Sequence, residues 1–145
     1  MSLARLILVL AIAYVVSGFS RTVSALPQTA RTTNDAVFTA EQAKRGEVLY
    51  QFICATCHGP ALTGIEAAPP LAGTTFGASW SGAVVADLFE RIRVSMPQDK
   101  PGTLGRQQAA DVVAYILSFN KVPAGSAELP GDLEVLKAIT IVSPQ

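Results

Sequence analysis

The residues best suited to chemistry lie together in the segment Cys54-Ala55-Thr56-Cys57-His58. Two cysteines three residues apart lie on one side of a helical turn, where their thiols can form thioethers with the two vinyl groups of one porphyrin. The histidine that follows then lies under the iron and can ligate it through an imidazole nitrogen. This pattern is the attachment signal for heme c. It predicts one covalent heme, anchored by Cys54 and Cys57 and ligated by His58.

The same cysteines fit other chemistry less well. A structural zinc site needs four ligands, and the sequence has no cysteine or histidine besides these three residues. A disulfide across so short a loop would constrain the unfolded chain little. Thioredoxin-like redox chemistry belongs to a βαβ context, and no strand-like alternation is found in the sequence. Heme attachment is therefore the favoured interpretation.

The second axial ligand follows by elimination. Apart from Met1, the only methionine is Met96, which precedes Pro97 at the predicted end of a helix. A buried core methionine is the alternative, since methionine commonly fills gaps in cores. If Met96 and His58 both bind the iron, neither axial site is open and the reduction potential is raised. That arrangement suits electron transfer and hinders oxygen or peroxide chemistry.

Two further features are expected near the heme. A metal-bound histidine usually donates its other N–H to an acceptor, and a carbonyl in Pro69-Pro70-Leu71 is a candidate. The indole N–H of Trp80 either donates to a heme propionate or the ring simply packs, because a buried indole usually has an acceptor.

Helices must position these residues. Thr39 is a suitable N-cap, and Gln42 completes a capping-box pattern ahead of a predicted helix over 40–53. Within that helix, Gly46 implies that another backbone passes close by. The other expected elements are a loop over 59–77, helices over about 81–94 and 106–119, and a short helix from Asp132 through Ile139. The second helix is expected to end at Met96-Pro97, because proline disfavours helix in the residue before it.

The ends of the chain give the domain organisation. Residues 1–25 have a basic start, an apolar run and a small-residue end, which is the layout of a secretory signal peptide. A membrane anchor is the alternative, but the run over 6–16 is shorter than the roughly 20 residues that span a bilayer. We expect export to the periplasm, a flexible lead-in over 26–38, a main domain over 39–122 and a C-terminal extension over 123–145.

Charge and composition limit the partners. Removal of residues 1–25 would take away two arginines and no acidic residue, which leaves nine basic and eleven acidic residues. This balance gives no reason to expect nucleic acid or an anionic membrane as partner. No stable membrane anchor is expected after cleavage. Only 7% of the residues are aromatic, so the predicted core is small and the heme is expected to contribute to folding.

These motifs resemble the class I cytochrome c family over about residues 39–122. The matching features are Gly46 and Tyr50, the CxxCH segment with Gly59, the stretch 69–73, Met96-Pro97, and 112–117. The resemblance implies an all-α fold of three main helices and long loops around one heme, with a short C-terminal extension. It also implies that Gly46 and Tyr50 face the segment around Tyr115, and that the carbonyl of Pro69 accepts the hydrogen bond from His58.

A narrower resemblance covers parts of 96–130. This part of the sequence is similar to the cytochrome domains of quinohemoprotein alcohol dehydrogenases and to small cytochromes that partner periplasmic quinoprotein dehydrogenases. This implies a non-enzymatic electron carrier that takes one electron from a dehydrogenase and passes it toward a terminal oxidase or another cytochrome. The alternatives are a permanently bound heme subunit that docks through the segment 122–145, and a sensor or enzyme with an open sixth site.

Overall fold

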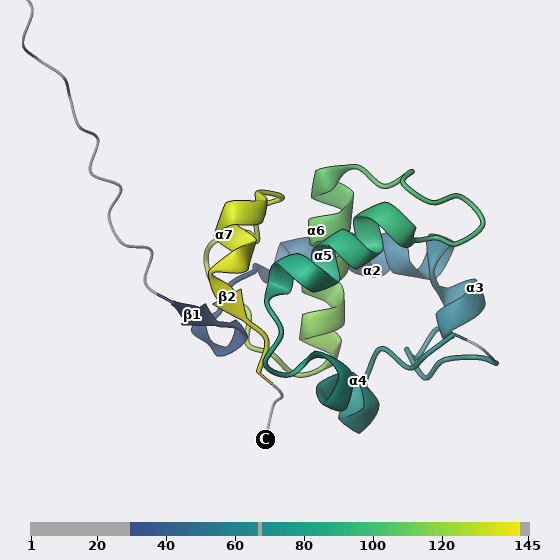
Figure 1. Cartoon of the computed structure of the whole chain (residues 1–145), viewed down its shortest axis with the longest axis horizontal. Coiled ribbons are helices and arrows are strands. Elements are labelled where there is room, and N and C mark those ends of the chain that lie inside the picture. The colour runs from purple at the N-terminus through teal and green to yellow at the C-terminus, as the bar shows by residue number, and fades with distance from the viewer. Residues whose placement is uncertain (1–29, 67, 143–145) are drawn as a thin grey trace, which may run out of the picture.

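The computed structural model describes residues 30–66 and 68–142 (Figure 1). The expected signal peptide and the first residues of the lead-in lie outside this range. The described elements are mostly helical, in the order β1 (Arg31–Thr32), η1 (Thr33–Asp35), α2 (Ala40–Ile53), α3 (Ala55–His58), α4 (Gly73–Trp80), α5 (Val85–Ser95), α6 (Arg106–Phe119), α7 (Leu133–Lys137) and β2 (Ile139–Thr140).

The centre of the fold is the crossing of α2 and α6. A Cβ added to Gly46 would lie 1.8 Å from the carbonyl oxygen of Asp111 and 2.9 Å from the Cβ of Tyr115, so only glycine permits this approach. Beside it, the rings of Tyr50 and Tyr115 pack with their centroids 5.2 Å apart. The predicted backbone contact at Gly46 and the predicted position of Tyr50 are both confirmed.

The capping box predicted at the start of α2 is half right. The Thr39 hydroxyl accepts the N–H of Gln42 at 3.1 Å, as a cap should. The Gln42 side chain does not return to Thr39. It is fully buried and instead pairs with both backbone groups of Leu129, at 2.8 and 2.7 Å. The reason is tertiary, because the buried main chain of Leu129 offers a donor and an acceptor that the sequence pattern cannot reveal.

The region between the heme motif and α5 differs from the prediction. The loop expected over 59–77 contains most of α4, and α5 begins at Val85 rather than near Ser81. The first residues of α4, Gly73 to Gly77, carry little helix signal, because they include two glycines and two β-branched threonines. The helix is anchored instead by tertiary burial, since its Phe76 is only 2% exposed. The end of α5 at Ser95, with Met96 as C-cap, agrees with the expected proline stop.

The lead-in was expected to be flexible, and its described part is not. β1 pairs in parallel with β2, and Val37 and Phe38 are buried in the core. The carbonyl oxygen of Phe38 also accepts the N–H of Gly125 at 2.7 Å. Two large apolar side chains drive this docking by the area that they remove from water, which corrects the prediction for residues 30–38.

The C-terminal extension belongs to the same folded unit. Four of its large apolar side chains are buried in the common core: Leu129, Leu136, Ile139 and Ile141. Arg45 of α2 bridges Asp111 of α6 and Glu128 of the extension, with Nη2–Oε1 at 2.8 Å to the latter. In Figure 1 the extension lies with β1 at the end of the molecule away from α3. Across residues 30–66 and 68–142, no helix combines the length and the apolar character needed to cross a membrane.

Candidate cofactor site

The two cysteines lie at the junction of α2 and α3. Cys54 ends α2, with its N–H donated to the carbonyl oxygen of Tyr50 at 2.8 Å, and its own carbonyl accepts the N–H of His58 at 2.9 Å. The single turn of α3 then carries Cys57 and His58. Both cysteines are free thiols, Cys54 partly buried and Cys57 exposed. Continuous helical turns therefore set the relative positions of the two thiols and the imidazole.

The His58 ring has its orientation set by a backbone acceptor. Its Nδ1 lies 2.9 Å from the carbonyl oxygen of Pro69. This is the hydrogen bond that the family resemblance implied. A carbonyl oxygen can only accept, so Nδ1 must carry the proton and donate it. In the neutral ring the lone pair is then on Nε2, which leaves that nitrogen as the one able to ligate a metal.

The loop after His58 folds back tightly to make this contact. The N–H of Gly64 donates to the carbonyl oxygen of His58 at 2.8 Å. Gly64 has a φ of +76°, and a Cβ there would lie 2.8 Å from the nitrogen of Pro70. A glycine is needed for both reasons, and the close turn brings the Pro69 carbonyl to the histidine.

Tyr50 supports the turn from the interior. Its hydroxyl donates to the carbonyl oxygen of Gly59 at 2.7 Å. Burial raises the pKa of Tyr50 above its ordinary value of 10.0, and the nearby Cys54 and Tyr115 add to the effect. The phenol therefore stays protonated and remains a donor at neutral pH. This hydrogen bond was not predicted from the sequence, although a tyrosine on the buried face of α2 signals a hydroxyl that must find an acceptor.

The Cys54 thiol is unlike the nucleophile of a disulfide-exchange enzyme. Burial raises the pKa of Cys54 to about 11, and the neighbouring Cys57 contributes further. Reactive exchange cysteines have lowered pKa values, because the thiolate is the nucleophile. In the described part of the chain, no group of three or more His, Cys, Asp or Glu side chains is arranged to hold a metal ion.

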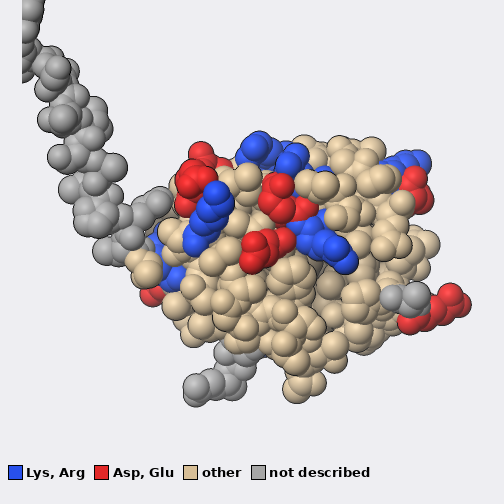
Figure 2. Space-filling view, in the orientation of Figure 1, with Lys and Arg blue, Asp and Glu red and all other residues tan. Residues whose placement is uncertain are grey.

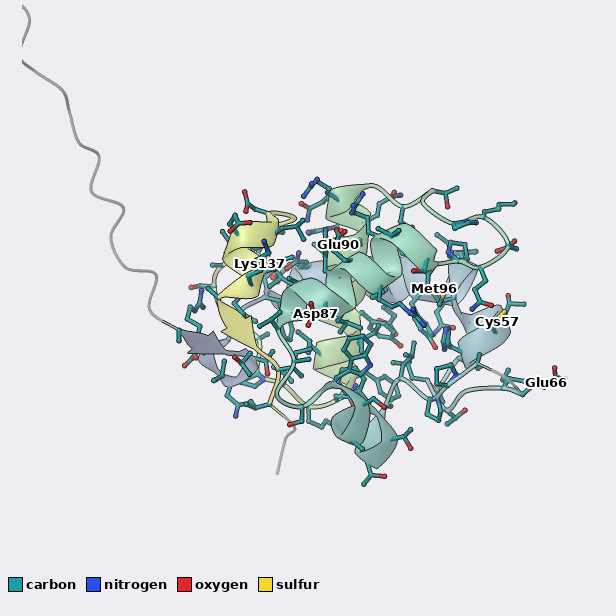
Figure 3. The ribbon with its side chains drawn as sticks, viewed as in Figure 1. Cys57, Glu66, Asp87, Glu90, Met96 and Lys137 are labelled. Atoms are coloured by element: carbon teal, nitrogen blue, oxygen red, sulfur yellow. The ribbon has the colours of Figure 1, made fainter. Side chains whose placement is uncertain are left out.

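Met96 and Trp80 lie on separate elements around the motif. Met96 follows α5, is partly buried, and lies toward the same end of the molecule as Cys57 in the view of Figure 3. Trp80 ends α4 and packs against the core while partly exposed. Iron ligation by Met96 and a propionate contact from Trp80 stay predictions.

The donor set fits a heme c. Two thiols near one helical turn can form the two thioethers, a neutral imidazole has its Nε2 lone pair available, and a thioether side chain lies beyond α5. Partly buried apolar side chains border the core on this side, among them Ile53 and Leu71. The residues that would hold the group are Cys54, Cys57, His58 and Met96.

Comparison with known proteins is consistent with this fit. The family model described as "Cytochrome C oxidase, cbb3-type, subunit III" matches residues 41–116. A chain in the crystal structure of the sulfane dehydrogenase SoxCD from Paracoccus pantotrophus is similar, with a TM-score of 0.57 and 21% identity over 73% of this chain. The match covers 60% of that chain, and at this identity it shows a shared fold alone. No curated protein matches the sequence.

Proposed function

Because the chain belongs to the cytochrome c family described as cytochrome c oxidase, cbb3-type, subunit III, we propose that it is a periplasmic one-electron carrier with a single covalent heme c. The membership and the shared fold confirm the predicted class I cytochrome c fold. They also support a c-type cytochrome that functions in electron transfer. The number of hemes, the covalent attachment, the location and the partners belong to the proposal.

The observation that carries the proposal is the hydrogen bond from His58 to Pro69 beside the two thiols. It fixes the imidazole tautomer that ligates iron through Nε2, in the residue directly after Cys57. When bound, the heme supplies reversible one-electron chemistry. The chain's own residues would have separate roles: Cys54 and Cys57 would hold the heme covalently, and His58 and Met96 would bind its iron. A filled coordination sphere favours electron transfer over reaction with small molecules.

For the redox partners we propose a dehydrogenase as donor, of quinoprotein type, and a terminal oxidase or another cytochrome as acceptor. The support for the donor is the narrower resemblance over 96–130. The stretch 59–83, which includes the loop around His58, contains Glu66 as its only charged residue. On the face shown in Figure 2, the charged side chains gather over α5 and α7 rather than over α4. A partner that contacts the surface formed by the stretch 59–83 would be bound with little dependence on charge. This suits a small and short-lived electron-transfer interface.

The structure bears on the alternative of a permanently bound subunit. That hypothesis used the extension as a docking element. Four of its large apolar side chains are buried against the chain's own core, and Leu129 and Leu136 among them have no exposed area. These four are not available to a partner, whereas Leu133 and Val135 are partly exposed. This burial supports the free carrier. The sensor or open-site enzyme requires that Met96 does not bind iron.

The proposal is tested by expressing the full chain in a bacterium that attaches heme c in its periplasm. Heme that stays with the polypeptide after denaturation, at one per chain by mass spectrometry, is the expected result, together with a reversible one-electron titration. Cys54→Ala with Cys57→Ala should lose the covalent heme. A wild-type protein that releases its heme on denaturation, or is found only in the cytoplasm, would contradict the proposal. Gel filtration of the native protein separates a monomeric carrier from a bound subunit.

A further inference from the structure

Asn120 joins the end of α6 to the loop that contains the Pro69 carbonyl. It is the C-cap of α6 and is only 6% exposed. Its Oδ1 accepts the N–H of Gly73 at 2.9 Å, and its Nδ2 donates to the carbonyl oxygens of Leu71 and Ile116 at 2.9 and 2.8 Å. These three partners fix the orientation of the amide. In the flipped amide, the NH2 group would face the N–H of Gly73 and the oxygen would face the two carbonyl oxygens.

The residues that Asn120 holds are connected almost rigidly to the acceptor of His58. Leu71 is fixed on both sides, since its own N–H donates to the carbonyl oxygen of Leu62 at 2.8 Å. Only Pro70 separates Leu71 from Pro69. The φ angles of Pro69 and Pro70 are fixed by their rings. A displacement of Leu71 is therefore transmitted to the Pro69 carbonyl.

The other partner in that hydrogen bond is positioned from the same pair of helices. His58 follows Cys54 at the end of α2, and α2 packs against α6 at Gly46. The α2–α6 crossing therefore positions both groups of this hydrogen bond. It positions His58 through the peptide chain of α2 and the Pro69 carbonyl through the Asn120 side chain at the end of α6.

We propose that Asn120 is a positioning residue for the heme histidine: it holds the Pro69 carbonyl on Nδ1 of His58 and thereby sets the reduction potential. The inference rests on the proposed function, because the potential is that of the bound heme. Donation of the Nδ1 proton to a carbonyl makes the imidazole a more basic ligand, which favours the oxidised iron. A loosened acceptor should raise the potential.

The test compares Asn120→Leu, which has similar volume and no hydrogen bonds, with Leu136→Ala, which removes buried apolar volume from α7 in the extension. Both variants should unfold at lower denaturant concentration than the wild type. Only Asn120→Leu should shift the reduction potential upward. If Asn120→Leu leaves the potential at the wild-type value, or if Leu136→Ala moves it equally, the inference is wrong.

A measurement on the wild type remains decisive if the variants do not fold. The Gly73 amide should exchange with deuterium as slowly as amides in the middle of α6, because its acceptor is a buried side chain. Exchange at the rate of an open loop would overturn the inference. Absence of covalent heme from the wild type would instead contradict the proposed function, so the two failures are distinguishable.

Discussion

Gly46→Ala gives the sharpest test of the α2–α6 crossing. The added Cβ would lie 1.8 Å from the Asp111 carbonyl oxygen, where ordinary contact begins at 3.4 Å. The obstructing atoms are backbone and cannot turn aside, so the helices must separate by about 1.5 Å, and a gap of even 0.5–1 Å forfeits a quarter to a half of the local dispersion energy. Alanine recovers about 1 kcal/mol of helix propensity. Strain and lost contact outweigh that gain, and we expect a net destabilisation of about 2–4 kcal/mol.

The assay is denaturant unfolding of the heme-loaded protein, followed by circular dichroism. Lys44→Ala, at an exposed position of the same helix, is the matched control and should change the free energy of unfolding by less than about 0.5 kcal/mol. The packing of Tyr50 against Tyr115 should also loosen in Gly46→Ala, with a change in the near-ultraviolet spectrum. If Gly46→Ala unfolds at the wild-type denaturant concentration, the close crossing described above is incorrect.

Three further results are expected. Gln42→Ala should cost about 2–3 kcal/mol, because both backbone groups of Leu129 lose a buried partner. Gln51→Ala changes an exposed side chain, whose hydrogen bonds to Pro60 and Tyr115 can be replaced by water, and should cost under about 1 kcal/mol. Equal losses in unfolding experiments would refute this. Tyr50→Phe should cost about 1–3 kcal/mol by leaving the Gly59 carbonyl unpaired. Because the pKa of Tyr50 is raised in the folded state, the stabilisation by its protonated hydroxyl is full below pH 10.0 and is lost as the pH rises above that value. In urea titrations, the difference in free energy of unfolding between the wild type and Tyr50→Phe should therefore narrow at alkaline pH and stay constant at lower pH. The rate of electron exchange with an uncharged redox protein should change little between low and high salt, and a steep decline with salt in stopped-flow measurements would show that charges steer the contact.

Local sequence signals predicted the long helices well. The helix over 40–53 has a polar cap and helical spacing, and the helix over 106–119 has a continuous apolar face; both match the observed bounds of α2 and α6. Gly46 was informative because a glycine within a good helix costs stability and needs a reason. The CxxCH segment predicts the heme ligands because the spacing of its side chains encodes one geometry, and the hydrogen bond expected between His58 and Pro69 is present.

The features that were missed depend on partners distant in sequence. Gln42 matched a capping box, but its partner is Leu129, 87 residues away. The start of α4 is capped by Asn120, 47 residues downstream of Gly73. The segment around Phe38 was expected to be flexible because it is polar and has no periodicity, yet it contacts the C-terminal extension, where the N–H of Gly125 donates to the Phe38 carbonyl. Composition and periodicity cannot report such contacts.

The coordination of the iron is tested most directly by the absorption spectrum of the purified oxidised protein, wild type beside Met96→Ala. Iron held by His58 and Met96 should give the weak red band of thioether ligation in the wild type and lose it in the variant. The reduced wild type should not bind carbon monoxide rapidly, whereas reduced Met96→Ala should. A wild-type spectrum without the band, with rapid carbon monoxide binding, would contradict the electron-carrier function and favour an open sixth site.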